Sequence, residues 1–158
     1  MTRKEEMLKA FDEVWLRKWE SLEGYTLKDI TEEEALYQHP AYKDEPLEEG
    51  HPPTGTVLYL LTHLYDVYRY YTMVVINRPK DVTSPPPPEA HSVAEAVDYI
   101  KKFRAELRDV FESLTEEQLE EPVSGDRTVA QLLRMLPRHD SWHTGQIAML
   151  RRLYGARE

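Results

Sequence analysis

The sequence predicts an all-α fold, a four-helix bundle with long connections between the helices. Four long segments carry apolar residues at the three- and four-residue spacing of one helix face, and polar or proline-rich stretches separate them. No segment shows the sustained alternation of apolar and polar residues that is typical of a half-buried strand. With 158 residues the chain is long enough for one domain with its own core, so we expect a single helical-bundle domain over residues 1–158.

The first helix is expected over residues 4–22, and Gly24 is expected to end it because glycine is favoured just after the last helical turn. Its apolar stripe consists of Met7, Leu8, Phe11, Trp15, Leu16 and Trp19. Thr31 and Glu34 then have the spacing of a capping box, which predicts a short helical turn. Prolines between residues 40 and 53 keep the rest of this connection irregular.

The second helix is expected to begin after Pro53, with Thr54 as its N-cap, and to run to Ile76. Pro79 follows closely and stops it. Its core-facing stripe is expected to be Leu60, His63, Val67, Tyr70 or Tyr71, and Val74. The prolines at 85–88 are interpreted as a stiff spacer crossing the bundle rather than as a ligand for a proline-recognition domain.

The third helix is expected to start at Ser92, which has Glu95 at capping-box spacing, and to end near Ser113. Residues 115–118 predict a short helical piece, and a loop follows at residues 122–126.

The fourth helix is expected to start at Thr128, whose capping-box partner is Gln131, and to run to Tyr154 with Gly155 as its stop. Pro137 lies inside this helix and should kink it. The core-facing stripe is expected to be Leu132, Leu136, His139, His143, Ile147 and Leu150.

Composition and charge exclude several classes of protein. The net charge of −9, from 20 basic and 29 acidic residues, argues against a nucleic-acid-binding surface, which needs basic residues to contact phosphates. The longest apolar run, residues 57–76, contains His63, Asp66 and Arg69, so it predicts a buried helix and not a membrane span. The N-terminus is charged and lacks the apolar core of a signal peptide, which makes the cytoplasm the expected location.

The chain contains no cysteine. This excludes disulfides, a protein thiol nucleophile and thiolate ligands. Any metal ion must therefore be bound through nitrogen and oxygen atoms.

Three histidines form the candidate metal site. His139 and His143 are four residues apart in the fourth predicted helix, so both rings project from one face, and His63 lies on the apolar stripe of the second helix. Burying three imidazoles costs free energy unless each has a partner, and one divalent cation would satisfy all three. Three protein ligands would leave a coordination position open for water or substrate.

The other histidines, His39, His51 and His91, lie in loops or at helix starts and are not expected to bind metal. Residues 139–143 match the zinc-protease motif H-E-x-x-H except that Asp140, which is one methylene shorter, replaces the glutamate. Asp140 could therefore act as a shortened general base. A protease is disfavoured, because no further ligand follows in the helix and no strand is available to hold a peptide. Asp140 is therefore expected either to support a metal ligand without touching the metal or to lie on the helix surface.

These motifs resemble the DinB-like (damage-inducible) family of four-helix metalloenzymes over nearly the whole chain. The resemblance is carried by Leu61-Thr62-His63-Leu64, by His139-Asp140-Ser141-Trp142-His143-Thr144-Gly145-Gln146-Ile147, and by the tail at residues 150–155. It implies a divalent metal bound by His63, His139 and His143, with water completing the shell, and a homodimer. Family members are similar to bacillithiol or mycothiol S-transferases and to a mycothiol-dependent isomerase, so the resemblance specifies the site better than the reaction.

Three functions are compatible with this reading. The leading hypothesis is a metal-dependent transferase that joins a low-molecular-weight thiol to a small-molecule electrophile, with the metal stabilising the thiolate. The second is a metal-dependent hydrolase with metal-bound water as nucleophile, and the third is a non-enzymatic metal-binding stress-response module. Imidazole ligands favour zinc or nickel, and iron or manganese are also compatible. The sequence does not identify a catalytic residue.

Overall fold

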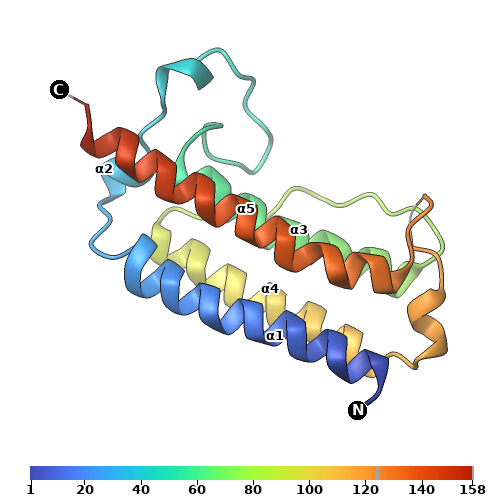
Figure 1. Cartoon of the computed structure of the whole chain (residues 1–158). Coiled ribbons are helices and arrows are strands. Elements are labelled where there is room, and N and C mark those ends of the chain that lie inside the picture. Colours follow the sequence, from blue (N-terminus) through green and yellow to red (C-terminus); the bar gives the residue numbers. More distant parts are fainter. Residues whose placement is uncertain (124, 158) are drawn as a thin grey trace.

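The computed structural model describes residues 1–123 and 125–157, without the side chains of residues 14–21. Within these residues it contains no β-strand and four long helices, α1 (Arg3–Ser21), α3 (Val57–Asn77), α4 (Val93–Ser113) and α5 (Val129–Gly155) (Figure 1). Shorter helical segments are η1 (Leu22–Thr26), α2 (Glu32–Ala35), η2 (Pro40–Tyr42) and η3 (Glu117–Glu120). The predicted all-α helical bundle is confirmed.

The direction of the helices explains why the connections are long. In Figure 1, α3 and α4 run side by side in one direction, and α1 and α5 run in the opposite direction. The segment between α3 and α4 must therefore return along the length of the bundle. It does so against α3, where the Tyr65 hydroxyl donates to the Pro88 carbonyl at 2.6 Å and Arg69 donates to the Pro85 carbonyl. The prolines at 85–88 act as the predicted spacer along the bundle.

Side-chain caps start the helices at the positions that the sequence indicates, with one exception. The hydroxyl of Ser92 accepts the Glu95 amide, and Thr128 forms a complete capping box with Gln131 at the start of α5. The second predicted helix, however, begins two residues later than expected. Its N-cap is Thr56, whose hydroxyl accepts the Tyr59 amide at 3.0 Å, so the prediction of Thr54 is wrong.

The end of the first helix also differs from the prediction. Gly24 does not end it, because the backbone continues into the π-helical segment η1. The amide of Leu27 reaches back five residues to the carbonyl of Leu22 at 2.5 Å. This wider turn buries Leu22 and Thr26. Tertiary burial has outweighed the local preference for a stop at the glycine.

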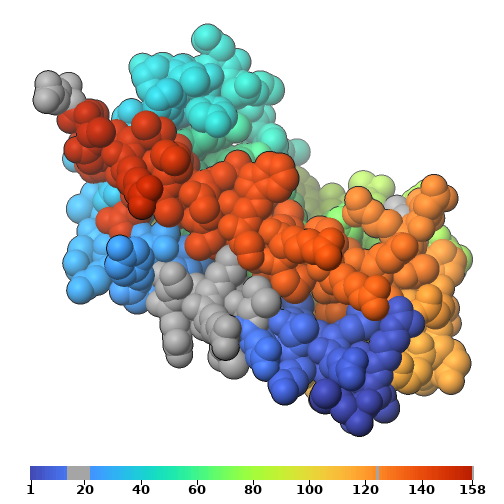
Figure 2. Space-filling model, viewed as in Figure 1, coloured from blue at the N-terminus to red at the C-terminus, as the bar shows by residue number. Residues whose placement is uncertain are grey.

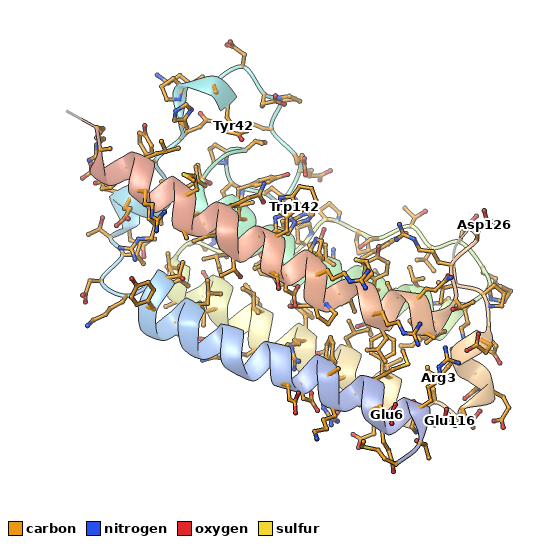
Figure 3. All side chains as sticks on the ribbon, in the orientation of Figure 1. Arg3, Glu6, Tyr42, Glu116, Asp126 and Trp142 are labelled. Carbon is orange, nitrogen blue, oxygen red and sulfur yellow. The ribbon has the colours of Figure 1, made fainter. Side chains whose placement is uncertain are left out.

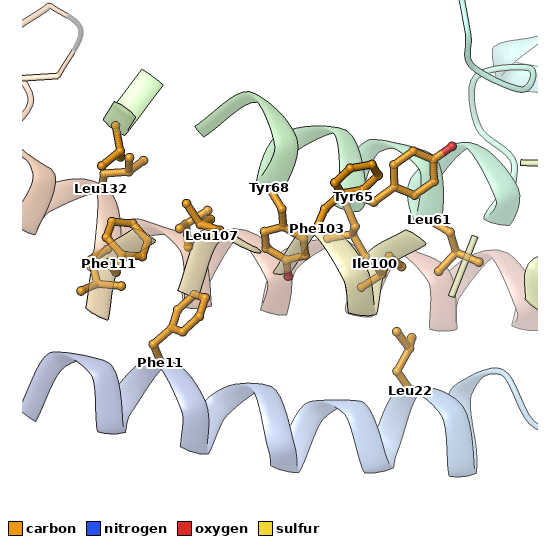
Figure 4. Close-up of a cluster of buried hydrophobic side chains, with 14 of the residues drawn as sticks. Phe11, Leu22, Leu61, Tyr65, Tyr68, Ile100, Phe103, Leu107, Phe111 and Leu132 are labelled. Carbon is orange, nitrogen blue, oxygen red and sulfur yellow. The ribbon is translucent and has the colours of Figure 1, made fainter. Parts of the chain in front are cut away.

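The core lies between all four long helices. Figure 4 shows Phe11 of α1, Tyr65 and Tyr68 of α3, and Phe111 of α4 among its buried side chains, and Leu132 of α5 joins them. Met7, Leu8 and Phe11 are buried as predicted, whereas Trp15, Leu16 and Trp19 lie outside the described side chains.

The buried stripe of α3 is offset from the predicted one. Its deepest residues are Leu61, Tyr65, Tyr68 and Val75, while His63 and Val67 are only partly buried. The offset follows from the aromatic rings of α3 and α4, since Tyr65 packs against Tyr99 with ring centroids 5.3 Å apart. His63 therefore lies at the edge of the core rather than at its centre.

α5 continues through Pro137 to Gly155 without a break in its helical assignment. No helix among the described residues is long and apolar enough to cross a membrane.

The segment before α3, cyan in Figures 1 and 2, stands over the C-terminal half of α5. This segment forms one wall of the site described next.

Candidate metal centre

The three predicted histidines meet at one point between α3 and α5. The Nε2 atom of His139 lies 3.1 Å from Nε2 of His63 and 3.1 Å from Nε2 of His143. All three ligand atoms lie within 4.8 Å of one another. The four-residue spacing on α5 puts His139 and His143 on one face, and the contact between α3 and α5 brings His63 to them.

The spacing of the nitrogen atoms fits a common metal ion. Two imidazole nitrogens that bind one zinc ion at ordinary bond lengths are about 3.0–3.4 Å apart. The observed separations of 3.1 Å fall within that range. The cluster could therefore hold one divalent ion through three nitrogen ligands.

The opposite nitrogen of each α5 histidine faces an oxygen atom. Nδ1 of His143 lies 2.6 Å from Oε1 of Gln146, one turn further along the helix. Nδ1 of His139 lies 3.5 Å from Oδ1 of Asp140, and within the described residues neither of these two buried atoms has a hydrogen-bond partner. The bond to the Gln146 oxygen places the ring proton of His143 on Nδ1 and leaves the lone pair on Nε2, where a metal would bind.

His63 is also in the form that binds metal. Burial and, to a smaller extent, the neighbouring rings of His143, His139 and His51 together lower the pKa of His63 from its ordinary value to about 4. The ring is therefore neutral at neutral pH, with one nitrogen available as a ligand.

Asp140 lies behind the cluster, inside the bundle. It is only 4% exposed, and its Oδ2 accepts a hydrogen bond of 2.7 Å from the hydroxyl of Tyr68. The possibility that Asp140 lies on the helix surface is thereby corrected, because its side chain points towards α3 and not towards solvent. Burial, together with the Asp140 carboxylate, raises the pKa of Tyr68 well above its ordinary value, so this hydroxyl remains a donor.

A buried cation stands behind this pair. Arg104 of α4 is 5% exposed, and its guanidinium donates to the carbonyl of Phe11 at 3.1 Å. Its charge acts on both Tyr68 and Asp140, and its own pKa is lowered by burial to about 10. Its ion pair is with Asp12 of α1, with Nη2 and Oδ1 3.8 Å apart.

A cavity of about 480 Å³ opens on the other side of the cluster, and His63 and His143 form part of its wall. Tyr59 stacks on His63 with ring centroids 6.4 Å apart and donates its hydroxyl to Glu48 at 3.0 Å. Burial and the bond to Glu48 raise the pKa of Tyr59 to about 12. A molecule in this cavity would lie directly beside the candidate ligands.

The cavity wall also depends on one glycine. Gly55 has a φ of +80°, and a Cβ atom there would lie 2.4 Å from the ring of Tyr42. Tyr42, labelled in Figure 3, is carried by the segment that stands over α5. Only glycine permits both this backbone conformation and this close approach.

The other three histidines lie outside the cluster. Nδ1 of His39 accepts the amide of Ala41 and caps η2, although the His39 ring also lines the cavity. His51 lies beside Asp66, with Nε2 and Oδ2 4.0 Å apart, and His91 is exposed.

Sequence reasoning missed the partners of the ligand histidines. Gln146 could have been recognised, since it follows His143 by three residues and so lies on the same helix face. Tyr59 and Tyr68 of α3 and Arg104 of α4 had no such signal in the sequence. Only the packing of the helices defines which faces of α3 and α4 lie next to the site.

Comparison with known families gives one match. A family model described as the DinB superfamily matches residues 11–147, a range that includes all three histidines of the cluster. Comparisons with curated proteins and with solved structures found no match.

Proposed function

The chain belongs to the DinB superfamily, and on that premise we propose that it is a metal-dependent transferase that uses a low-molecular-weight thiol. His63, His139 and His143 hold one divalent ion, the sulfur of the thiol reaches that ion, and a small electrophile occupies the cavity beside it. The chain has no cysteine, so the reactive sulfur must arrive with the cosubstrate.

One observation carries the proposal of a metal ion. The Nε2 atoms of His63, His139 and His143 converge between α3 and α5, with Nε2 of His139 lying 3.1 Å from each of the other two. Three imidazole nitrogens at this spacing match the ligand type and the ligand separations of one divalent ion.

The ligand set supports zinc or nickel, which neutral imidazole suits, and iron or manganese remain compatible. Three neutral ligands leave the ion its full charge, and such an ion supplies the positive field that favours a thiolate over a thiol. The residues of the chain hold the geometry for this chemistry. Gln146 orients the ring of His143, Asp140 places a carboxylate oxygen 3.5 Å from Nδ1 of His139, and Tyr59 stacks on His63.

A hydrolase is less well supported by the same geometry. It would need a general base on the cavity side, but Asp140 is buried behind His139 and is bonded to Tyr68. None of the described residues that line the cavity carries a carboxylate. A purely structural metal site is also disfavoured, because such sites close with four protein ligands and the described cluster offers three.

Cobalt substitution tests the transferase directly. Cobalt(II) is loaded into the protein, and bacillithiol, mycothiol, glutathione and coenzyme A are added in turn. We expect at least one thiol to produce a sulfur-to-cobalt charge-transfer band near the ultraviolet edge, and the same thiol to be consumed with an electrophile such as 1-chloro-2,4-dinitrobenzene. If none of the four changes the cobalt spectrum, the transferase proposal loses its basis and the hydrolase takes its place.

The proposal includes a homodimer in the cytoplasm. A thiol-dependent reaction suits that compartment, where low-molecular-weight thiols are kept reduced. Light scattering at micromolar concentration tests the dimer, and a monomeric mass would remove it.

A further inference from the structure

The wall of the cavity beside the histidines is mainly apolar. Its volume of about 480 Å³ is typical of a site for a small organic molecule. The apolar part of the wall comes from two tyrosines, three leucines and a methionine: Tyr42, Tyr59, Leu60, Met149, Leu150 and Leu153. Such a surface gains free energy by covering the apolar part of a ligand.

The cavity offers no cation from the chain itself. None of the described residues that line it is a lysine or an arginine. Arg151, next to Leu150 in the sequence, is turned away and held by Glu34, with Nε and Oε1 2.6 Å apart. Arg69 of α3 is likewise held by Asp66 at 2.7 Å.

The polar groups of the wall are few, and two of them are already engaged. Gln146 uses its amide oxygen on His143, and His39 uses Nδ1 on the amide of Ala41. The carboxylate of Glu48 accepts the hydroxyl of Tyr59 at 3.0 Å, which places negative charge next to a residue of the cavity wall. An anionic ligand would lie near this charge and find no cationic side chain among the described residues of the wall.

From this wall we infer that the cavity selects an uncharged, largely apolar electrophile and discriminates against anionic electrophiles. The apolar part of the substrate lies between Tyr59 and the side chains of Met149 and Leu153, and its reactive end reaches His63 and His143. The role of this molecule as the electrophile rests on the proposed transferase function. The selectivity of the cavity for uncharged molecules does not depend on it.

Calorimetry with two matched probes tests the selectivity. Biphenyl-4-methanol and biphenyl-4-carboxylate have nearly the same shape and differ in charge. Both are titrated into protein freed of metal by a chelator, since a carboxylate could also bind the ion. We expect the neutral probe to bind at least about 10-fold more tightly, which corresponds to about 1.4 kcal/mol.

Two variants locate the effect in the cavity. Met149 lines the cavity at its rim and is 53% exposed, so Met149→Lys places a cation there without disturbing the core. We expect this variant to bind the carboxylate at least about as well as the alcohol. Ile76→Lys makes the same change at another exposed apolar residue, 61% exposed near the end of α3, and should leave the wild-type preference unchanged.

The inference is overturned if the wild-type protein binds the carboxylate as tightly as the alcohol, if it binds neither probe, or if Met149→Lys leaves the ratio unchanged. None of these results depends on metal. The content of metal in the purified protein is measured separately, so failure of the metal centre and failure of the cavity's selectivity give different results.

Discussion

The two sides of the histidine cluster are built in opposite ways. Behind it, Asp140, Tyr68 and Arg104 are buried, charged or polar, and joined to one another or to the backbone. In front of it lies an open cavity with mainly apolar walls. The comparison indicates a division of roles, in which the rear region fixes the ligand rings and the front region decides which molecules reach them.

Substitution of a ligand histidine should have the largest effect on metal affinity. The division of roles between the rear and front regions depends on an ion bound by these histidines. We expect His143→Ala to lower metal affinity by more than about 100-fold, beyond what the loss of a supporting residue costs. His91→Ala removes an exposed histidine outside the cluster and serves as the control. Elemental analysis after dialysis measures both. Equal and stoichiometric metal in the two variants would contradict the assignment.

Substitutions at two buried tyrosines of α3 distinguish a residue that supports the metal site from one that supports only the fold. Tyr68 donates its hydroxyl to Asp140 at 2.7 Å, and Tyr65 donates to the carbonyl of Pro88 at 2.6 Å. Each change to phenylalanine should lower the free energy of unfolding by about 1–2 kcal/mol, since each leaves a buried acceptor without its donor. Only Tyr68→Phe should also weaken metal binding, by about 10-fold.

Competition with a chromogenic chelator measures the affinity of both tyrosine variants, and thermal unfolding of the metal-free protein measures stability. If Tyr65→Phe and Tyr68→Phe weakened metal binding equally, the rear region would have only a structural role.

The smallest effect is expected in the front region, at Gly55, and Gly125 in the loop before α5 is a matched control because it also has a positive φ. Gly55 has φ +80° with the ring of Tyr42 against it, and Gly125 has φ +61° with open space around it. Alanine at either position should cost about 1–2 kcal/mol of stability through backbone strain. Gly55→Ala should in addition displace Tyr42 and weaken binding of biphenyl-4-methanol severalfold, as calorimetry would show. A similar loss of probe binding in Gly125→Ala would mean that Tyr42 does not shape the cavity.

The difference between the two regions also explains how far the sequence could predict the site. His139, His143 and Gln146 lie on one helix at spacings that a single turn defines, and their side chains meet as the helical period requires. His63 could be predicted because it recurs with the apolar residues of α3. The ring of His63 lies beside the most deeply buried stripe of α3 and not in it. The packing of Tyr65 and Tyr68 against α4 sets the rotation of α3 about its axis.

Features that depend on several elements were beyond the sequence. The pairing of Tyr68 with Asp140 spans 72 residues, and the cavity needs the segment before α3 to stand over α5. Local signals also failed where a tertiary contact was stronger than a preference. Gly24 did not end its helix because η1 buries Leu22 and Thr26, and Thr56 rather than Thr54 caps α3.

X-ray absorption spectroscopy of the zinc-loaded protein tests the central claim most directly. Three imidazole nitrogens at about 2.0–2.1 Å are expected around the ion, together with one oxygen ligand from water that the protein does not supply. His143→Ala should leave no more than two imidazoles in any residual signal. A wild-type shell with fewer than three imidazoles, or one completed by a protein carboxylate, would contradict the proposed metal centre.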